Sequence, residues 1–523
     1  MKLSAALLLL AAGQTVNALL PIHIKDYRFI KPASPNSTES ENEVFYVKGI
    51  DYQPGGSSGY DPESDSDVLS DPEQCARDAF VFQQLGINTI RVYTLNPDIN
   101  HDKCMTILNN AGIYVILDVN GPHYGENLNR ADPVGTYNAW YMSRVFRFID
   151  AFKNYPNVLG FFAGNEIIND ESNYAEIDPQ FIRAIQRDMK EYIAKHSNRT
   201  IPVGYSAADN VDLRLPTLNY LQCNSLTGGN ITKTMQESRS DFFGLNTYEW
   251  CSGSSDWKSS GFDKLNSSFS DAVIPVIFSE YGCNKNKPRT FDEVSEGLYG
   301  GLKAVFSGGL VYEYSEEANE YGLVTIDPED GSITFKEDFE NLKNQLKNSS
   351  LPTIKEKDVP KSEIFKCNAS LITSEFSDFG VKNFSIPEQS KDTAYVIKWG
   401  ANGTEGQILK NYTAPTTFKY EIKNVDGSVI PATITYPSSN LINELQTSST
   451  MSVSSTSSAS VTSSAKSSSV SSSTKKGKSS KSKASKSTSS GNKKARNGAE
   501  MISTPGFGTG FAAAVAAAVA ALL

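Results

Sequence analysis

Short apolar runs alternate with helix-period stretches over the first two thirds of the chain, and this alternation restricts the fold more than any other feature. Between the runs, Asp78 to Leu85 and Phe181 to Ile193 have the apolar spacing of helices that pack on one face. Eight strands interleaved with helices predict a (β/α)8 barrel, although a doubly wound open sheet would give the same alternation. The runs, rich in β-branched and aromatic residues, are Tyr46 to Tyr52, Thr89 to Thr94, Tyr114 to Val119, Val158 to Gly164, Ile201 to Ser206, Phe242 to Tyr248, Val273 to Ser279 and Gly309 to Tyr314.

The residues that end these runs are unusually polar, and in a (β/α)8 barrel the active site lies at the carboxyl ends of the strands. Glu166 follows the fourth run and Glu280 the seventh. Glycoside cleavage needs one carboxylic acid and one carboxylate, and a separation of about 5 to 5.5 Å gives retention. We therefore predict Glu166 as acid/base and Glu280 as nucleophile, against the alternative of surface or capping carboxylates. Tyr93, Tyr248 and Tyr312 also stand at strand ends, where aromatic rings either stack on sugars or belong to the core or rim.

Six segments carry a resemblance to a known family. The chain resembles the fungal β-1,3-glucanosyltransferases of glycoside hydrolase family 72, in family order across about residues 45 to 330. The matching segments are KGIDYQPGG from Lys48, GINTIRVYTLN from Gly86, VLGFFAGNEIIND from Val158, IPVGYSAAD from Ile201, FSEYGCN from Phe278 and SGGLVYEYS from Ser307.

The resemblance implies an enzyme that cuts inside a β-1,3-glucan donor and passes the new reducing end to the non-reducing end of an acceptor glucan. It assigns acid/base to Glu166 and nucleophile to Glu280, and it implies no cofactor and no metal. It places glucan contacts at Tyr93, Asn165, Asp209, Arg214 and Tyr312, and in the loop starting at Asn120. Cysteine spacing alone leaves about fifteen pairings. The resemblance selects Cys75–Cys104, Cys223–Cys367 and Cys251–Cys283, which leaves no cysteine for the carbohydrate-binding module of some family members.

One loop departs from the family pattern. The segment GPHYGENLNRADP after the third run is longer than usual and carries His123 and Tyr124. If these side chains occupy the sugar path, the protein is a glucan-binding wall protein with weak or no activity. A third possibility is an endo-β-1,3-glucanase, in which water instead of a sugar hydroxyl cleaves the glycosyl-enzyme intermediate with the same two carboxylates.

Both ends of the chain predict secretion and anchoring. Residues 1–18 have the layout of a signal peptide, and residues 497–523 that of a glycosylphosphatidylinositol attachment signal with Asn497 as the lipidated residue. The protein is expected at the outer face of the plasma membrane, with the cell wall as the other possible destination. Its net charge of −10 does not suggest a nucleic-acid partner. Asn-x-Ser/Thr acceptors agree with secretion and occur at Asn36, Asn198, Asn230, Asn266, Asn348, Asn368, Asn383, Asn402 and Asn411.

The predicted domain layout follows from changes in composition. Residues 19–350 form the catalytic barrel, and residues 441–496 form a Ser/Lys-rich stalk that cannot bury enough apolar surface to fold. Between them, residues 351–440 have strand-like runs at Tyr395 to Trp399 and Phe418 to Ile422. We interpret this region as a small β-rich extension, with an ordered wrap on the first domain as the alternative.

Overall fold

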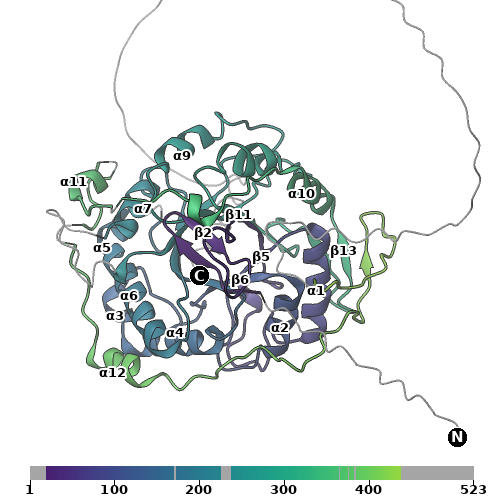
Figure 1. The fold of residues 1–523 in the computed structure, drawn as a ribbon, viewed down its shortest axis with the longest axis horizontal. Helices are drawn as coiled ribbons and strands as arrows, with labels where there is room; N and C mark the ends of the chain where they lie inside the picture. Colours follow the sequence, from purple (N-terminus) through teal and green to yellow (C-terminus); the bar gives the residue numbers. More distant parts are fainter. Residues whose placement is uncertain are drawn as a thin grey trace, which may run out of the picture. The chain divides into compact units, whose positions relative to one another are not determined.

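Eight parallel strands close into a barrel in the computed structural model of the protein (Figure 1). The structure describes residues 19–169, 172–224, 237–363, 365–374, 376–381 and 384–437. The predicted (β/α)8 barrel is confirmed, and β11 pairs with β4 to close the sheet, which excludes the open alternative. The strands are β4 (Val47–Asp51), β5 (Thr89–Val92), β6 (Tyr114–Asp118), β7 (Val158–Asn165), β8 (Val203–Ala208), β9 (Phe242–Thr247), β10 (Val276–Tyr281) and β11 (Gly308–Val311).

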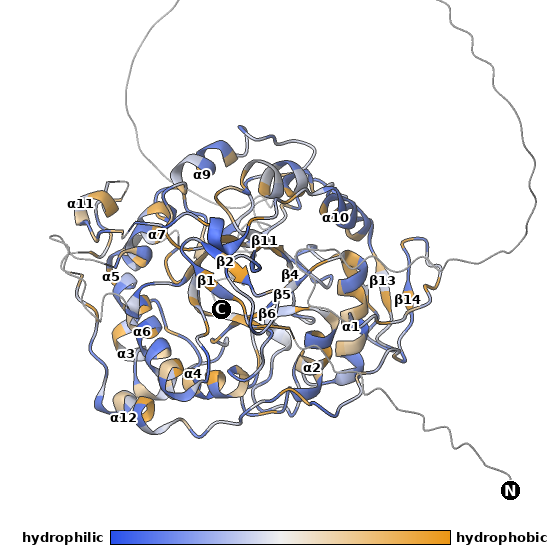
Figure 2. Ribbon diagram, in the orientation of Figure 1, coloured by the Kyte–Doolittle hydropathy of each residue, from blue (hydrophilic) through white to orange (hydrophobic). Residues whose placement is uncertain are grey.

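Helices surround the barrel and return the chain from one strand to the next. Figure 2 shows hydrophobic and hydrophilic residues alternating along α4 and α6, as expected for helices with one buried face. The helix α1 has clear local signals: the Asp71 carboxylate accepts a hydrogen bond from the Glu73 amide, and Gly86 ends it at φ 80°. The surrounding helices are α1 (Pro72–Leu85), α2 (Asp102–Ala111), α4 (Ala139–Phe152), α6 (Pro179–His196), α7 (Arg214–Gln222), α9 (Phe262–Ser268), the π-helical η2 (Glu293–Gly301) and α10 (Glu337–Asn348).

A small antiparallel sheet that the sequence did not predict covers the amino-terminal end of the barrel. It consists of β1 (His23–Lys25), β2 (Arg28–Lys31) and β3 (Glu43–Phe45). Phe29 and Phe45 pack against residues that point into the barrel, with the Phe29 and Phe242 rings 5.6 Å apart. The barrel is therefore filled and closed at this end, which leaves the carboxyl ends of the strands as the open face.

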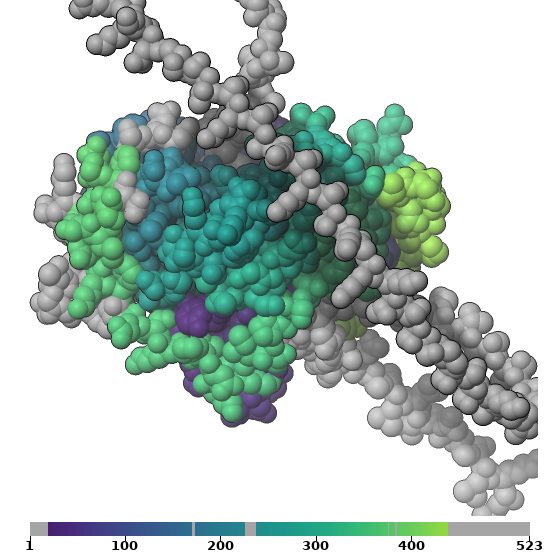
Figure 3. Space-filling model, turned by 90° about the horizontal axis from the view of Figure 1, so that it is seen from above, coloured from purple at the N-terminus to yellow at the C-terminus, as the bar shows by residue number. Residues whose placement is uncertain are grey.

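Residues 351–437 run over the outside of the barrel helices. The prediction of a strand at Tyr395 to Trp399 is wrong, because these residues lie in α12 (Lys391–Trp399). Of the other predicted run, only Ile422 is in a strand, the two-residue β14 (Ile422–Lys423). In place of a β-rich extension, the described residues of this region form the ordered wrap, with η3 (Glu356–Asp358), α11 (Ala369–Ile372) and α12 as its helices. Figure 3 shows its first part, in green, beside the purple amino-terminal residues.

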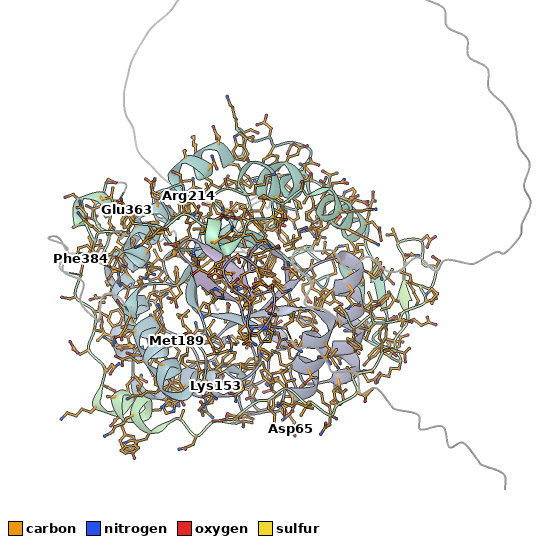
Figure 4. The ribbon with its side chains drawn as sticks, viewed as in Figure 1. Asp65, Lys153, Met189, Arg214, Glu363 and Phe384 are labelled. Atoms are coloured by element: carbon orange, nitrogen blue, oxygen red, sulfur yellow. A yellow bond between two sulfur atoms is a disulfide. The ribbon has the colours of Figure 1, made fainter. Side chains whose placement is uncertain are left out.

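The wrap is joined to the barrel by hydrogen bonds and a disulfide. The Lys153 ammonium at the end of α4 (Figure 4) donates to Glu405 at 3.0 Å, and the Gln407 amide donates to Asp102 at 2.8 Å. The short sheet of β12 (Val324–Ile326) and β13 (Ile333–Phe335) takes β14 as its third strand. The disulfides of the structure are Cys75–Cys104, Cys223–Cys367 and Cys251–Cys283, the pairs that the resemblance implied.

Several predictions concern residues outside the described part. The signal peptide, the stalk, the attachment signal with Asn497, and the acceptors Asn230 and Asn383 are among them. Asn266 is half-buried, and the other six acceptors are exposed. Among the described residues, no helix has both the length and the apolar composition needed to cross a membrane. The remaining elements are η1 (Ser57–Gly59), α3 (Pro133–Thr136) and α5 (Ser172–Ile177).

Candidate active site

Glu280 lies at the carboxyl end of β10, where three donors hold its carboxylate. Tyr93 donates to Oε1 at 2.9 Å, Arg91 to Oε1 at 3.2 Å, and Tyr248 to Oε2 at 2.8 Å. The Arg91 guanidinium is fixed in turn by two hydrogen bonds to Asp118, of 3.1 and 2.7 Å. Charge-assisted bonds of this kind stabilise an ionised carboxylate. The Glu280 side chain is therefore oriented, and these bonds favour its anionic form.

Glu166 follows β7 and takes a conformation that few side chains adopt, with φ 46°. Two bonds hold this turn: the Glu166 amide donates to the Ser206 carbonyl at 2.8 Å, and Arg130 donates to the Glu166 carbonyl at 3.1 Å. The side chain accepts one bond, from Asn246 Nδ2 at 2.8 Å. Asn246 is also the register partner of Glu280 on the adjacent strand, so both carboxyl groups lie beside the same residue.

The environments of the two carboxyl groups separate their roles. Burial, and then the negative charge of Glu280, raise the pKa of Glu166 to about 7. Burial also raises the pKa of Glu280, but Arg91 and the hydroxyls of Tyr248 and Tyr93 oppose that rise. The two groups thus differ in their donors, three on Glu280 and one on Glu166, as expected of a nucleophile and an acid in glycoside cleavage. The carboxyl group that carries the proton near neutral pH is Glu166.

A buried polar network beneath the pair connects five strands, β5 and β7 to β10. Asn165 Oδ1 accepts from Arg91 at 3.0 Å, from Ser206 at 2.7 Å and from Asn246 at 3.1 Å. Ser279 in turn donates to Asn246 Oδ1 at 2.7 Å. The side-chain oxygen of Asn165 belongs to this network, and its role as a glucan contact stays a prediction. Arg91, Ser206 and Asn246 were not predicted as site residues, although their place at strand ends was the available signal.

Four tyrosine rings surround Glu280, and the sequence predicted three of them. The rings of Tyr93 and Tyr248 are 6.4 and 6.3 Å from that of Tyr312. The ring of Tyr321 lies 5.3 Å from Tyr312 and 5.6 Å from Tyr248. Tyr321 was not predicted because it lies on a connection beyond the eighth strand rather than at a strand end. Such a wall of rings can pack against the apolar faces of pyranose sugars.

The other predicted contacts lie at the same end of the barrel. Asp209 follows β8 and accepts from Arg214 at 2.5 Å, at the start of α7 (Figure 4). Asn120 follows β6, donates to the Ala163 carbonyl at 3.2 Å and accepts from Tyr141 at 2.6 Å.

Asp51, at the end of β4, is a buried acid that the sequence did not single out. Neither of its carboxylate oxygens has a hydrogen-bond partner within the described residues. Burial raises its pKa well above the ordinary value, so the group is expected to be neutral. A neutral Asp51 adds no negative charge near Glu280.

A family model described as glucanosyltransferase matches residues 11–350. The chain belongs to glycoside hydrolase family 72. It is 66% identical over 459 residues to the probable 1,3-beta-glucanosyltransferase GAS3 of Saccharomyces cerevisiae. This match covers 87% of each chain. It is 46% identical over 425 residues to the 1,3-beta-glucanosyltransferase gel2 of Aspergillus fumigatus. That match covers 80% of this chain and 83% of that protein.

The fold also resembles solved structures. One is Gas2p of Saccharomyces cerevisiae in complex with laminaritriose and laminaritetraose, with a TM-score of 0.61 and 36% identity. The match covers 72% of this chain and 79% of that one.

In this member of glycoside hydrolase family 72, the rings of the two unusual side chains in the loop after β6 pack on aromatic rings other than those around Glu280. The ring of His123 lies 5.7 Å from that of Tyr60, and the ring of Tyr124 lies 5.4 Å from that of Trp140. Tyr124 is 84% exposed. Among the described residues, neither ring contacts Glu166, Glu280 or the tyrosines around Glu280. The contacts of the two rings therefore favour an open site over the alternative in which these side chains occupy the sugar path.

Proposed function

We propose that this protein is a retaining β-1,3-glucanosyltransferase that lengthens glucan chains of the fungal cell wall. The observation that carries the proposal is the division between the two carboxyl groups. Glu166 holds a proton near neutral pH, whereas Glu280 accepts hydrogen bonds from Arg91 and two tyrosines, which orient its carboxylate and favour the ionised form. The names of the relatives, and the oligosaccharides bound to Gas2p, support β-1,3-glucan as the substrate.

In the first step, a Glu280 oxygen attacks the anomeric carbon of a glucose unit inside the donor chain. The bond to the glycosidic oxygen breaks, and Glu166 gives its proton to that oxygen. The donor part with the new reducing end stays bound to Glu280 as an ester, and the other part leaves. The hydrogen bonds from Tyr93 and Tyr248 hold the attacking carboxylate in place, which lowers the entropy lost on reaching the transition state.

In the second step, Glu166, now ionised, takes the proton of a hydroxyl at the non-reducing end of an acceptor glucan. The acceptor oxygen attacks the same anomeric carbon, and the bond to Glu280 breaks. Two inversions at one carbon give overall retention. Water in place of the acceptor would give hydrolysis by the same residues.

The decisive experiment is to incubate the purified protein with a reduced linear β-1,3-glucan oligosaccharide and to follow product lengths by mass spectrometry. We expect products longer than the substrate. Products that are only shorter would establish an endo-glucanase instead. No change in length, with binding still measurable, would indicate a glucan-binding protein. The Glu166→Gln and Glu280→Gln variants are the controls, and wild-type rates in either would contradict the assignment of roles.

The proposal includes secretion and a glycolipid anchor. It is supported by the sequence layout of residues 1–18 and 497–523 and by the density of glycosylation acceptors. Residues 441–496 would then be a stalk between the barrel with its wrap and the membrane. Release of the protein from intact membranes by phosphatidylinositol-specific phospholipase C is the test. A protein that stays bound to membranes after treatment, but loses its retention when Asn497 and the tail are deleted, would contradict lipid attachment and favour a spanning tail.

A further inference from the structure

The connection from β6 to α4 exposes a pair of aromatic rings to solvent. Tyr124 is 84% exposed and Trp140 is 60% exposed, and their ring centroids lie 5.4 Å apart. Val134, on the same connection, is 73% exposed. Large apolar side chains that gather on a surface are commonly a site of contact with another molecule.

The local structure holds the two rings in place. Gly125 has φ 84°, and a Cβ at this position would lie 2.2 Å from the Trp140 ring, so glycine is needed for Tyr124 to pack there. The Asn138 side chain caps α4 by accepting from the Trp140 amide at 3.0 Å. Because both the loop and the start of the helix are fixed, the rings form a rigid surface, and binding would cost little conformational entropy.

Glu126 fixes the rest of the loop. It accepts hydrogen bonds from the Tyr60 hydroxyl and from the His123 amide, each at 3.2 Å, and it forms an ion pair with Arg144 at 3.3 Å. The Asn127 side chain donates to the Gly121 carbonyl at 2.8 Å. These contacts within a short segment indicate that the loop has one fixed conformation.

The rings lie on a connection that is continuous with the carboxyl pair. The connection leaves the carboxyl end of β6, next to β7, which Glu166 follows. Asn120, at its start, donates to the Ala163 carbonyl, and Arg130, in its middle, donates to the Glu166 carbonyl. Tyr141, which follows Trp140, donates to Asn120. The loop therefore contacts the end of the strand that positions the acid/base, and the helix is joined to the loop at Asn120.

We propose that Tyr124 and Trp140 form an outlying subsite that binds a β-1,3-glucan chain beyond the sugars held at Glu166 and Glu280. This inference rests on the proposed function and extends its substrate site. A glucan polymer is neutral, and its pyranose rings present apolar faces with hydroxyl edges, which aromatic rings bind without charged partners. Asn127, Asn129 and Asn138 supply neutral polar groups on the same connection. The longer loop is thus an addition to the substrate site, not an obstruction of it.

The test measures affinity without turnover. In a Glu166→Gln background, calorimetry would give the affinity for linear β-1,3-glucan oligosaccharides of increasing length. Tyr124→Ala and Trp140→Ala are each expected to weaken binding about two- to tenfold, and only for oligosaccharides long enough to reach the rings. The side chain of Tyr124 is so exposed that its removal should leave folding intact, so this variant keeps the test valid if Trp140→Ala does not fold.

The chain offers a matched control. Tyr395 and Trp399 are a second exposed aromatic pair, 65% and 62% exposed, on α12, which packs on the outside of α4 and α6. Tyr395→Ala and Trp399→Ala should leave the affinity unchanged at every length.

The possible results distinguish a failure of the outlying subsite from a failure of the proposed function. If the Tyr124 and Trp140 variants bind every oligosaccharide as the parent does, the subsite is wrong and the proposed function stands. If they weaken short and long oligosaccharides equally, the rings act on the site at Glu166 and the separate subsite is also wrong. If the Glu166→Gln parent binds no oligosaccharide of any length, the proposed function fails. A change of sedimentation coefficient on Tyr124→Ala would instead identify the rings as a contact between two copies of the chain.

Discussion

Glu166 combines a left-handed backbone conformation with a half-buried carboxyl group, and both features have a cost in stability. A non-glycine residue at positive φ costs about 1 to 3 kcal/mol, and burial disfavours the ionised carboxylate. The bonds from Arg130 and to Ser206 offset part of this. The sequence predicted which two glutamates form the site, because both end strands of the barrel. It could not predict their backbone strain or their pKa values, since these depend on the partners Arg91, Arg130 and Asn246.

The Glu166→Gln variant is expected to be more stable than the wild type above pH 5. The native state raises the pKa of Glu166 from 4.5 to about 7, so between these values it binds more protons than the unfolded chain. Stability from this group therefore falls as pH rises through that window, and a glutamine avoids the loss. Melting temperatures at pH 4 and pH 8 would check it. The gain should appear at pH 8 and nearly vanish at pH 4, and an equal gain at both would contradict the assigned pKa.

The rate of the first step should fall as pH rises past about 7, because Glu166 must be protonated to release the leaving group. The single-turnover rate of release, measured over a pH series, should lose about tenfold for each unit beyond the pKa. Activity that stays constant to high pH would show that another group supplies the proton.

Tyr248→Phe should lower kcat by about ten- to a hundredfold, since a hydrogen bond to a charged group contributes about 1.5 to 3 kcal/mol. The phenylalanine keeps the ring in the aromatic wall, so KM should change less. Tyr321→Phe is the matched control, because its ring belongs to the same wall but its hydroxyl makes no hydrogen bond to Glu280. Equal effects of both substitutions would mean that Glu280 does not depend on Tyr248.

At the scale of elements, the barrel strands were predictable because strands buried on both faces read as continuous apolar runs. All eight appear, with ends that differ by a few residues. The segment Tyr395 to Trp399 was not predictable in this way, because its aromatic and β-branched residues suggested a strand. Ser390 caps α12 by accepting from the Thr393 amide, and Thr393 and Ile397, four residues apart, face the barrel helices. The cap and the helical spacing therefore outweigh strand propensity.

The Cys251–Cys283 disulfide joins the segments that follow β9 and β10, directly beyond Tyr248 and Glu280. We expect Cys251→Ser to lower the free energy of unfolding by about 2 to 5 kcal/mol, as for loss of a native bridge in a secreted domain. Denaturant unfolding of the single variants and of the Cys251→Ser, Cys283→Ser double variant would check this. The double variant should be no less stable than the singles, and additive losses would contradict a shared bond.

At the scale of the whole molecule, the domain boundary predicted at residue 350 marks a change in sequence pattern, but the wrap that follows it packs on the barrel. Residues after it contribute buried side chains to the same core as the barrel helices, including Ile372, Phe379, Ile397, Ile422 and Ile434. A composition change signals where the pattern of strands and helices stops. It does not signal whether the next segment packs on the domain before it, since that depends on partners far along the chain.

We expect a protein that ends at residue 350 to be much less stable than the full chain, although it retains every barrel strand. It would lose the Cys223–Cys367 disulfide and the bonds from the wrap to Asp102 and Lys153. It would also expose apolar surface on α4 and α6 that α12 now covers. Calorimetry of the full chain should give one cooperative transition for residues 19–437, and the shortened protein should melt at a lower temperature or aggregate. Two separate transitions in the full chain, with the barrel transition unchanged on truncation, would instead establish residues 351–437 as an independent domain.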